Sequence, residues 1–142
     1  DSIRCLITGQ ELLIRSDGTP QRDYLYVEDA VAGYLKLAEE LENVEIQGQA
    51  FNFSSGKPTS VLELVNTIIQ AYGEELSPKI LGEAKGEIDM QYLANQKALQ
   101  VLGWQPKHSL TDGLMKTIRW YKDYFGVDIN SIQPEITKKE GF

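Results

Sequence analysis

A turn, a short strand and an amphipathic helix are predicted in immediate succession over residues 16–41. Residues 17–20 are typical of a turn, because Gly tolerates positive φ and Pro fixes φ near the value that turns require. Residues 22–27 place tyrosines on one face and aliphatic side chains on the other, which is the period of a half-buried strand. Glu28 and Asp29 suit the start of a helix. The apolar positions expected on one face of that helix are Val31, Tyr34, Leu35, Ala38 and Leu41.

Arg22 is the candidate binding residue of this unit. Its guanidinium is permanently charged and carries five donors, so beside a turn and a strand it suits a diphosphate or a carboxylate. The alternative is a surface ion pair with Asp23 or Glu28, which would have little energetic weight.

Composition and charge exclude several classes of function. The 142 residues are enough for one core, and a net charge of -7 argues against a nucleic-acid-binding surface. No apolar run has the length of a membrane span and no signal peptide opens the chain, so we expect a cytoplasmic protein. Cys5 and His108 are the only residues of their kinds, so neither a metal site nor a Ser/His/Asp triad is predicted.

The remaining chain alternates strands and helices, which predicts an α/β fold. A helix tail is expected before Gly9, and a capping box at Ser60 and Glu63 predicts a helix that ends at Gly73. Trp104 and Trp120 are interpreted as core anchors, and His108 as exposed. Strands are predicted over residues 12–15, 50–54 and 78–81, and a last helix over residues 110–125.

The run D-G-T-P-Q-R-D-Y-L-Y-V-E-D-A-V, which contains Arg22, resembles the nucleotide-sugar epimerases and dehydratases of the extended short-chain dehydrogenase/reductase family. The resemblance extends from Asp1 to about Phe125. It implies an NAD-dependent isomerase or lyase of carbohydrate metabolism that acts on a nucleoside-diphosphate sugar. In such enzymes this stretch helps to hold the diphosphate, so the resemblance implies that role for Arg22.

The resemblance implies further substrate-binding residues. Leu13 and Arg15 lie in a strand that in related enzymes contacts the nucleotide base, although a core strand ending in a solvated Arg explains them equally. Asn52 matches an Asn near the phosphates, although a strand-end amide is more often a turn stabiliser.

A second block of resemblance covers residues 83–106 but departs from the family pattern. A second phosphate-binding Arg of many members aligns with Ala84, so Lys85 is the nearest replacement charge. Lys85 is a flexible point charge and would not reproduce a bidentate contact. A solvated loop of mixed charge is the alternative.

The family's dinucleotide and catalytic motifs do not occur in this sequence. No three glycines have the spacing G-x-x-G-x-x-G or G-x-G-x-x-G, and no Tyr has Lys four residues later. We therefore expect residues 1–126 to be the sugar-nucleotide-binding C-terminal portion of a longer enzyme, with an incomplete Rossmann-type domain and no catalytic, cofactor-binding or metal residue of its own. Residues 127–142 are expected to form a loose tail. The alternative is a stand-alone binding or scaffold domain without catalysis, and homo-oligomers are expected in either case.

Overall fold

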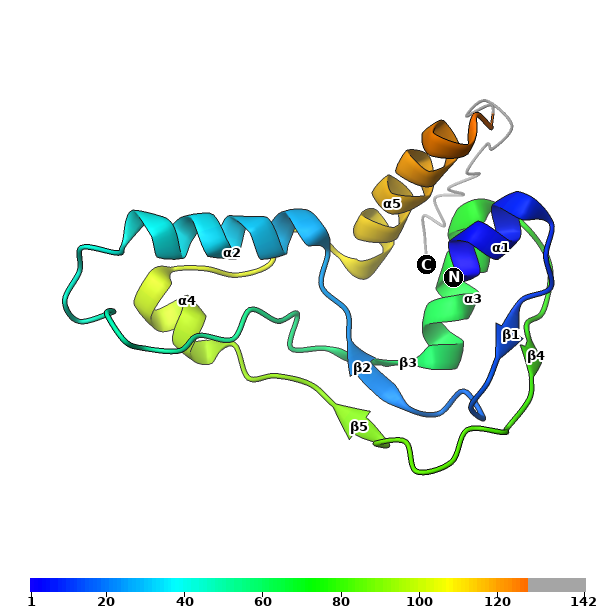
Figure 1. Ribbon diagram of the computed structural model, residues 1–142, viewed down its shortest axis with the longest axis horizontal. Helices are drawn as coiled ribbons and strands as arrows, with labels where there is room; N and C mark the ends of the chain where they lie inside the picture. Colours follow the sequence, from blue (N-terminus) through cyan, green and yellow to red (C-terminus); the bar gives the residue numbers. More distant parts are fainter. Residues whose placement is uncertain (128–142) are drawn as a thin grey trace, which may run out of the picture.

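The computed structural model describes residues 1–127, so the predicted tail lies outside the described residues except for Val127. Short strands alternate with helices along an elongated molecule (Figure 1). The helices are α1 (Ser2–Thr8), α2 (Val27–Glu39), α3 (Val61–Tyr72), α4 (Gln96–Leu102) and α5 (Leu110–Phe125). The strands are β1 (Leu13–Ile14), β2 (Gln21–Asp23), β3 (Pro58–Ser60), β4 (Lys79–Ile80) and β5 (Met90–Gln91).

The strands form two small sheets. Strand β1 pairs in parallel with β4, so that Ile14 lies opposite Ile80. In the other sheet β2 is central, antiparallel to β3 and parallel to β5, and Arg22 lies between Thr59 and Gln91. The candidate residue Arg22 is therefore held on both sides by backbone ladders.

Helix α3 is the centre of one half of the molecule. It follows the predicted capping box, in which Ser60 Oγ accepts from Glu63 N at 3.1 Å, and it ends at Gly73 in the left-handed region. One of its faces packs on β1 through Val65 and Ile69, and Ile68 packs between α1 and α5. None of the helices within residues 1–127 is both long and apolar enough to cross a membrane.

The other half of the molecule is built around α2, α4 and the segment between α2 and β3. Its core consists of Ile46, Ala98, Leu102 and Trp104, so the prediction for Trp104 is confirmed. Trp120, in contrast, is 59% exposed and stacks on Tyr124, so its prediction as a core anchor was wrong.

The apolar face that the sequence predicts for α2 is exposed. Val31, Tyr34 and Leu35 are half or more exposed, and the buried positions of α2 are Asp29 and Gly33. A Cβ atom at Gly33 would lie 2.7 Å from the ring of Phe53, so the helix lies against the following segment at its smallest residue. The apolar periodicity predicted the position of the helix in the sequence. It did not predict which side of the helix is buried.

Two predicted strands differ from the structure. The strand expected over residues 22–27 ends at Asp23, since the carboxylate of Asp23 binds another loop and α2 already begins at Val27. Residues 50–54 pair with no strand among the described residues. The predicted helix beginning at residue 110 is confirmed, and a capping box of Ser109 and Asp112 precedes it.

Candidate functional site

Three of the five predicted binding residues share one concavity. It has a volume of about 280 Å³ and lies beside β1 and β2, with Leu13, Arg15 and Arg22 in its wall. Among residues 1–127, Glu87 is the only acid that lines it. The other lining residues are Ser2, Ile14, Ser16, Pro20, Val61 and Val65.

Arg22 is half-buried and partly tied to the backbone. Its Nη1 donates to the carbonyl oxygens of Gln21 and Ile88, both at 2.7 Å. Within residues 1–127 Arg22 forms no ion pair, and Asp23 and Glu28, its two expected alternatives, contact other residues. Nη2 and Nε donate to no described protein acceptor, so the guanidinium retains donors for a ligand.

The side chain of Asp23, the residue after Arg22, links the opposite side of β2 to neighbouring loops. Its carboxylate accepts hydrogen bonds from the hydroxyls of Ser54 and Ser55, and from the Ser55 N–H at 3.0 Å. A longer bond of 3.4 Å comes from the Leu93 N–H. Burial acts to raise the pKa of Asp23, but these hydrogen bonds outweigh it and lower the pKa below its ordinary value. Asp23 therefore fixes the strand from which Arg22 extends.

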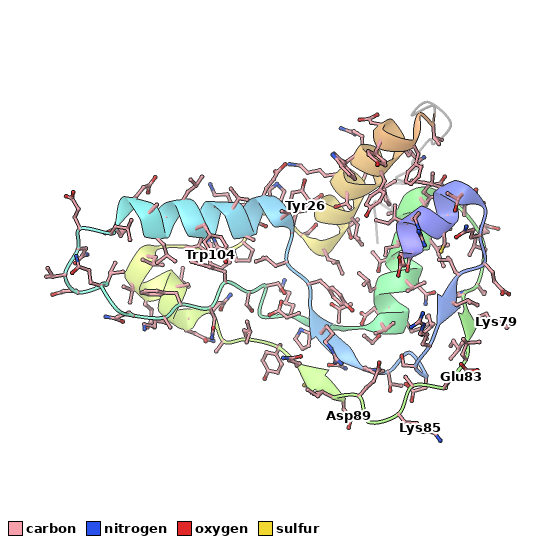
Figure 2. All side chains as sticks on the ribbon, in the orientation of Figure 1. Tyr26, Lys79, Glu83, Lys85, Asp89 and Trp104 are labelled. Carbon is pink, nitrogen blue, oxygen red and sulfur yellow. The ribbon has the colours of Figure 1, made fainter. Side chains whose placement is uncertain are left out.

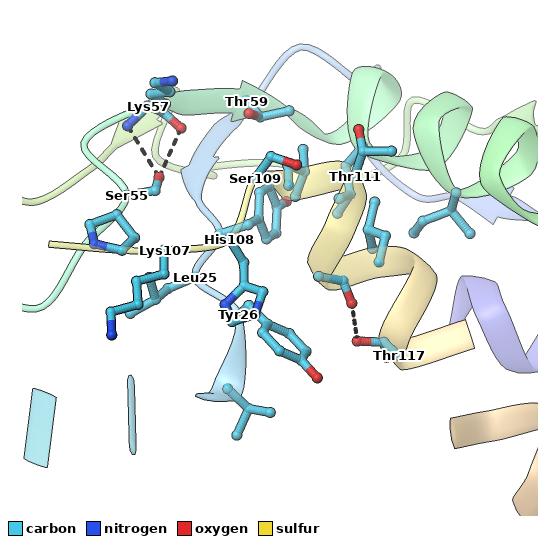
Figure 3. Close-up of a pocket in the computed structure, with 18 residues that line it drawn as sticks. Leu25, Tyr26, Ser55, Lys57, Thr59, Lys107, His108, Ser109, Thr111 and Thr117 are labelled. Atoms are coloured by element: carbon cyan, nitrogen blue, oxygen red, sulfur yellow. Dashed lines mark hydrogen bonds between the residues drawn. The ribbon is translucent and has the colours of Figure 1, made fainter. Parts of the chain in front are cut away.

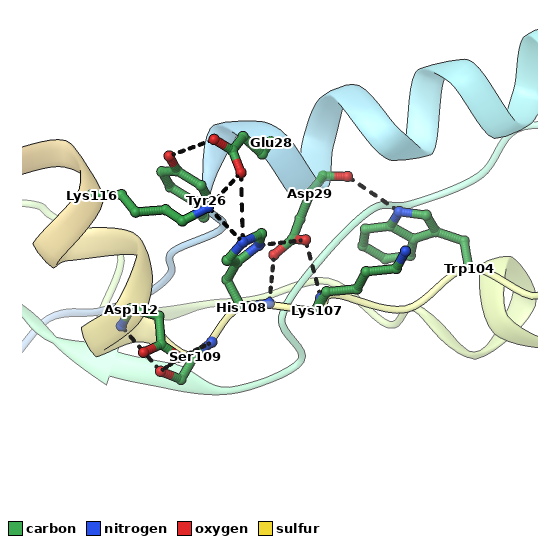
Figure 4. Close-up of polar contacts among 9 residues, drawn as sticks. All are labelled: Tyr26, Glu28, Asp29, Trp104, Lys107, His108, Ser109, Asp112 and Lys116. Carbon is green, nitrogen blue, oxygen red and sulfur yellow. Dashed lines mark hydrogen bonds and ion pairs between the residues drawn. The ribbon is translucent and has the colours of Figure 1, made fainter. Parts of the chain in front are cut away.

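A second carboxylate, which is buried, joins α2 to the start of α5 (Figure 4). Asp29 is 2% exposed and accepts from the backbone N–H groups of Lys107, at 3.0 Å, and His108, at 3.1 Å. His108 Nδ1 lies 3.0 Å from the same carboxylate, and the His108 side chain is only 22% exposed, so the prediction of an exposed His was wrong. Burial acts to raise the pKa of Asp29, whereas the hydrogen bonds from Lys107 and His108 lower it, and the net shift is downward.

Asn52 and Lys85 do not line this concavity. Asn52 Nδ2 donates to the Ala94 carbonyl oxygen at 3.3 Å, which is a contact with a distant loop and not with its own turn. Lys85 is exposed, and Figure 2 shows its side chain extending away from the molecule. The sequence argument missed Asp23 and Asp29, because an acid beside a strand or in the first turn of a helix does not reveal which distant N–H groups it accepts from.

A larger cavity of about 860 Å³ lies between the β2–β3 sheet and the helices α3 and α5 (Figure 3). Tyr24, Tyr26, Leu64 and Leu114 contribute to its mainly apolar wall. It contains none of the predicted binding residues. We place the candidate site in the smaller concavity, because Arg15 and Arg22 line it.

Residues 1–53 match the family model described as the NAD dependent epimerase/dehydratase family. The UDP-glucose 4-epimerase of Mycolicibacterium smegmatis is 32% identical over 118 residues, which is 83% of this chain and 36% of that protein. The UDP-glucose 4-epimerase of Dictyostelium discoideum is 31% identical over 73% of this chain and 30% of that protein.

Solved structures of 4-epimerases are also similar to this chain. The UDP-glucose 4-epimerase of Thermotoga maritima with UDP-glucose superimposes with a TM-score of 0.76 and 28% identity, over 87% of this chain and 38% of that one. The UDP-glucuronic acid 4-epimerase of Bacillus cereus, in complex with UDP-glucuronic acid and NAD, superimposes with the same TM-score and 25% identity, over 86% of this chain and 38% of that one. These matches confirm the predicted α/β class.

The chain spans about a third of the length of the curated relatives that it matches. The sequence similarity to these relatives nevertheless extends beyond residues 1–53 and covers most of this chain. This chain belongs to the NAD-dependent epimerase/dehydratase family.

Proposed function

We propose that this chain is the sugar-nucleotide-binding portion of an NAD-dependent nucleotide-sugar epimerase or 4,6-dehydratase. The observation that carries the proposal is Arg22, which keeps free guanidinium donors in a concavity shared with Leu13 and Arg15. A nucleoside diphosphate suits such a wall, because its base can contact the apolar strand and its phosphates can accept hydrogen bonds from the guanidinium groups. The complexes of relatives with UDP-sugars support this class of ligand.

The residues of this chain do not fit the cofactor itself. They include neither the glycine spacing of a dinucleotide-binding loop nor a Tyr followed four residues later by Lys. In the proposed full-length enzyme, NAD would supply the oxidation chemistry at C4 of the sugar. The residues of this chain bind and orient the sugar nucleotide. Contacts with the diphosphate hold the end of the substrate that does not react, and their binding energy positions the sugar ring.

The exposed face of α2 supports a longer protein. Apolar residues at helical spacing are usually covered in a folded domain, whereas Val31 and Leu35 of α2 are at least half exposed within residues 1–127. We infer that another portion of the protein covers them and supplies the catalytic groups. The alternative, a stand-alone binding or scaffold domain, has no role for NAD.

Incubating the full-length protein with NAD and UDP-glucose separates these two functions. We expect a product isomer or a dehydrated sugar in chromatography of the reaction mixture, and Arg22→Ala should lower the rate. Because the sugar is not identified, UDP-glucuronic acid, UDP-N-acetylglucosamine and dTDP-glucose are assayed in parallel. Tight binding of a sugar nucleotide without turnover of any of them would favour the binding domain and overturn the catalytic proposal.

A further inference from the structure

Arg15 is the second cation in the wall of the concavity. Within residues 1–127 its guanidinium forms neither a hydrogen bond nor an ion pair. Leu13 and Ile14 precede it in the same wall. We propose that Arg15 binds the phosphates of the sugar nucleotide together with Arg22, and that Lys85 does not. This inference rests on the proposed function and adds to it the residue that completes the diphosphate site.

The backbone of Arg15 is fixed at the edge of the concavity. Its carbonyl oxygen accepts from the N–H groups of Glu83, at 2.8 Å, and Ala84, at 3.1 Å. The strand pairing of β1 with β4 is thereby extended beyond Ile14. A long side chain that starts from a fixed backbone reaches a limited region, and this region includes the concavity.

The charges of the wall favour an anion between the two arginines. Arg15 and Arg22 face one acid, Glu87, and neither arginine forms an ion pair with it. Two guanidinium groups in one small concavity repel each other, and a ligand with two phosphoryl groups removes that repulsion. Each planar fork can donate two parallel hydrogen bonds to phosphoryl oxygens.

Lys85 is the competing source of the second positive charge. It lies one residue beyond Ala84, yet it does not line the concavity and its side chain extends into solvent (Figure 2). Sequence proximity made Lys85 the nearest replacement charge. The structure favours Arg15, which approaches from another strand.

Calorimetric titration of the full-length protein with UDP and with uridine tests this assignment. We expect Arg15→Ala to weaken UDP binding about tenfold and to leave uridine binding within about twofold, because uridine lacks the phosphates. Arg15→Lys should restore part of the loss, since it keeps the charge but not the fork. Lys85→Ala is the matched control and should change UDP binding less than about twofold.

The outcomes separate the inference from the proposed function. Equal losses of UDP and uridine affinity in Arg15→Ala would make Arg15 a base contact and overturn the inference. An unchanged UDP affinity in Arg15→Ala, or a tenfold loss in Lys85→Ala, would overturn it as well. No UDP binding by the unsubstituted protein would instead overturn the proposed function.

Discussion

Adjacent residues of strand β2 have different tasks. Arg22 lines the concavity, whereas the carboxylate of Asp23 accepts from Ser54, Ser55 and Leu93 in the neighbouring loops. Successive side chains of a strand point to opposite faces, so one short strand both presents the proposed ligand contact and anchors it. An Arg22–Asp23 surface pair, which the sequence left open, is excluded by this geometry.

Asp29 has the corresponding structural task at the start of α2. We expect Asp29→Ala to lower the free energy of unfolding by about 1 to 3 kcal/mol, because the part-buried N–H groups of Lys107 and His108 lose their acceptor. Urea unfolding of the full-length protein measures this loss. Glu28→Ala is the control, since its carboxylate pairs with the exposed Lys116, and an equal effect of both substitutions would contradict the role of Asp29.

The lowered pKa of Asp29 gives the same prediction a pH dependence. A carboxylate with a depressed pKa contributes its stability fully above the ordinary value of 3.8, and the contribution disappears as the pH falls through the lower folded value. The difference between the wild type and Asp29→Ala should therefore be constant near neutral pH and shrink below about pH 4. A difference that grows in acid would contradict this assignment.

The position of α2 depends on its smallest residue. Gly33 contacts the ring of Phe53, and a Cβ atom there would lie within 2.7 to 2.9 Å of three ring atoms. The apolar face predicted for α2 from the sequence is the one with the larger side chains, and that face is exposed. Periodicity gives the existence and length of a helix, but a Gly at the close contact leaves no apolar signal.

Gly33→Ala tests which effect is larger. Ala favours a helix by about 1 kcal/mol, whereas overpacking against Phe53 costs about 1 to 3 kcal/mol. We expect a net loss of stability of about 1 kcal/mol in thermal unfolding. Adding Phe53→Leu should cost less in the Gly33→Ala background than alone, because a smaller side chain relieves the clash, and strictly additive effects would contradict a direct contact.

The sequence predicted the local elements better than their assembly. The capping box at Ser60 and the helix end at Gly73 depend on neighbouring residues, and both were predicted correctly. The hydrogen bonds of Asp29 to Lys107 and His108 join residues almost 80 positions apart, and no local pattern encodes them. Of the predicted site, Arg22 lines the concavity because a short strand fixed its place, whereas Lys85 does not, because its loop lacks such a constraint.

At the scale of the whole molecule, the exposed apolar face of α2 is the surface that the proposal expects to be covered. In the full-length protein, Leu35→Lys should lower the free energy of unfolding by about 2 kcal/mol, the cost of placing a charge where an apolar side chain is buried. Leu35 is 60% exposed among the described residues. Val44→Lys, at a position that is 77% exposed, is the control and should be nearly neutral. Equal losses of stability in Leu35→Lys and Val44→Lys would show that the apolar face of α2 remains in solvent. The formation of homo-oligomers is a separate prediction.

Calorimetric titration of full-length Arg22→Ala with UDP-glucose, beside the wild type, tests the central claim most directly. We predict a loss of about 1.5 to 3 kcal/mol of binding free energy, the range of a hydrogen bond to a charged group, and a similar loss with UDP alone. Thermal unfolding of both proteins without ligand controls for the two backbone contacts of Arg22. Unchanged affinity for UDP in a folded Arg22→Ala protein would contradict the assignment of this concavity as the diphosphate site.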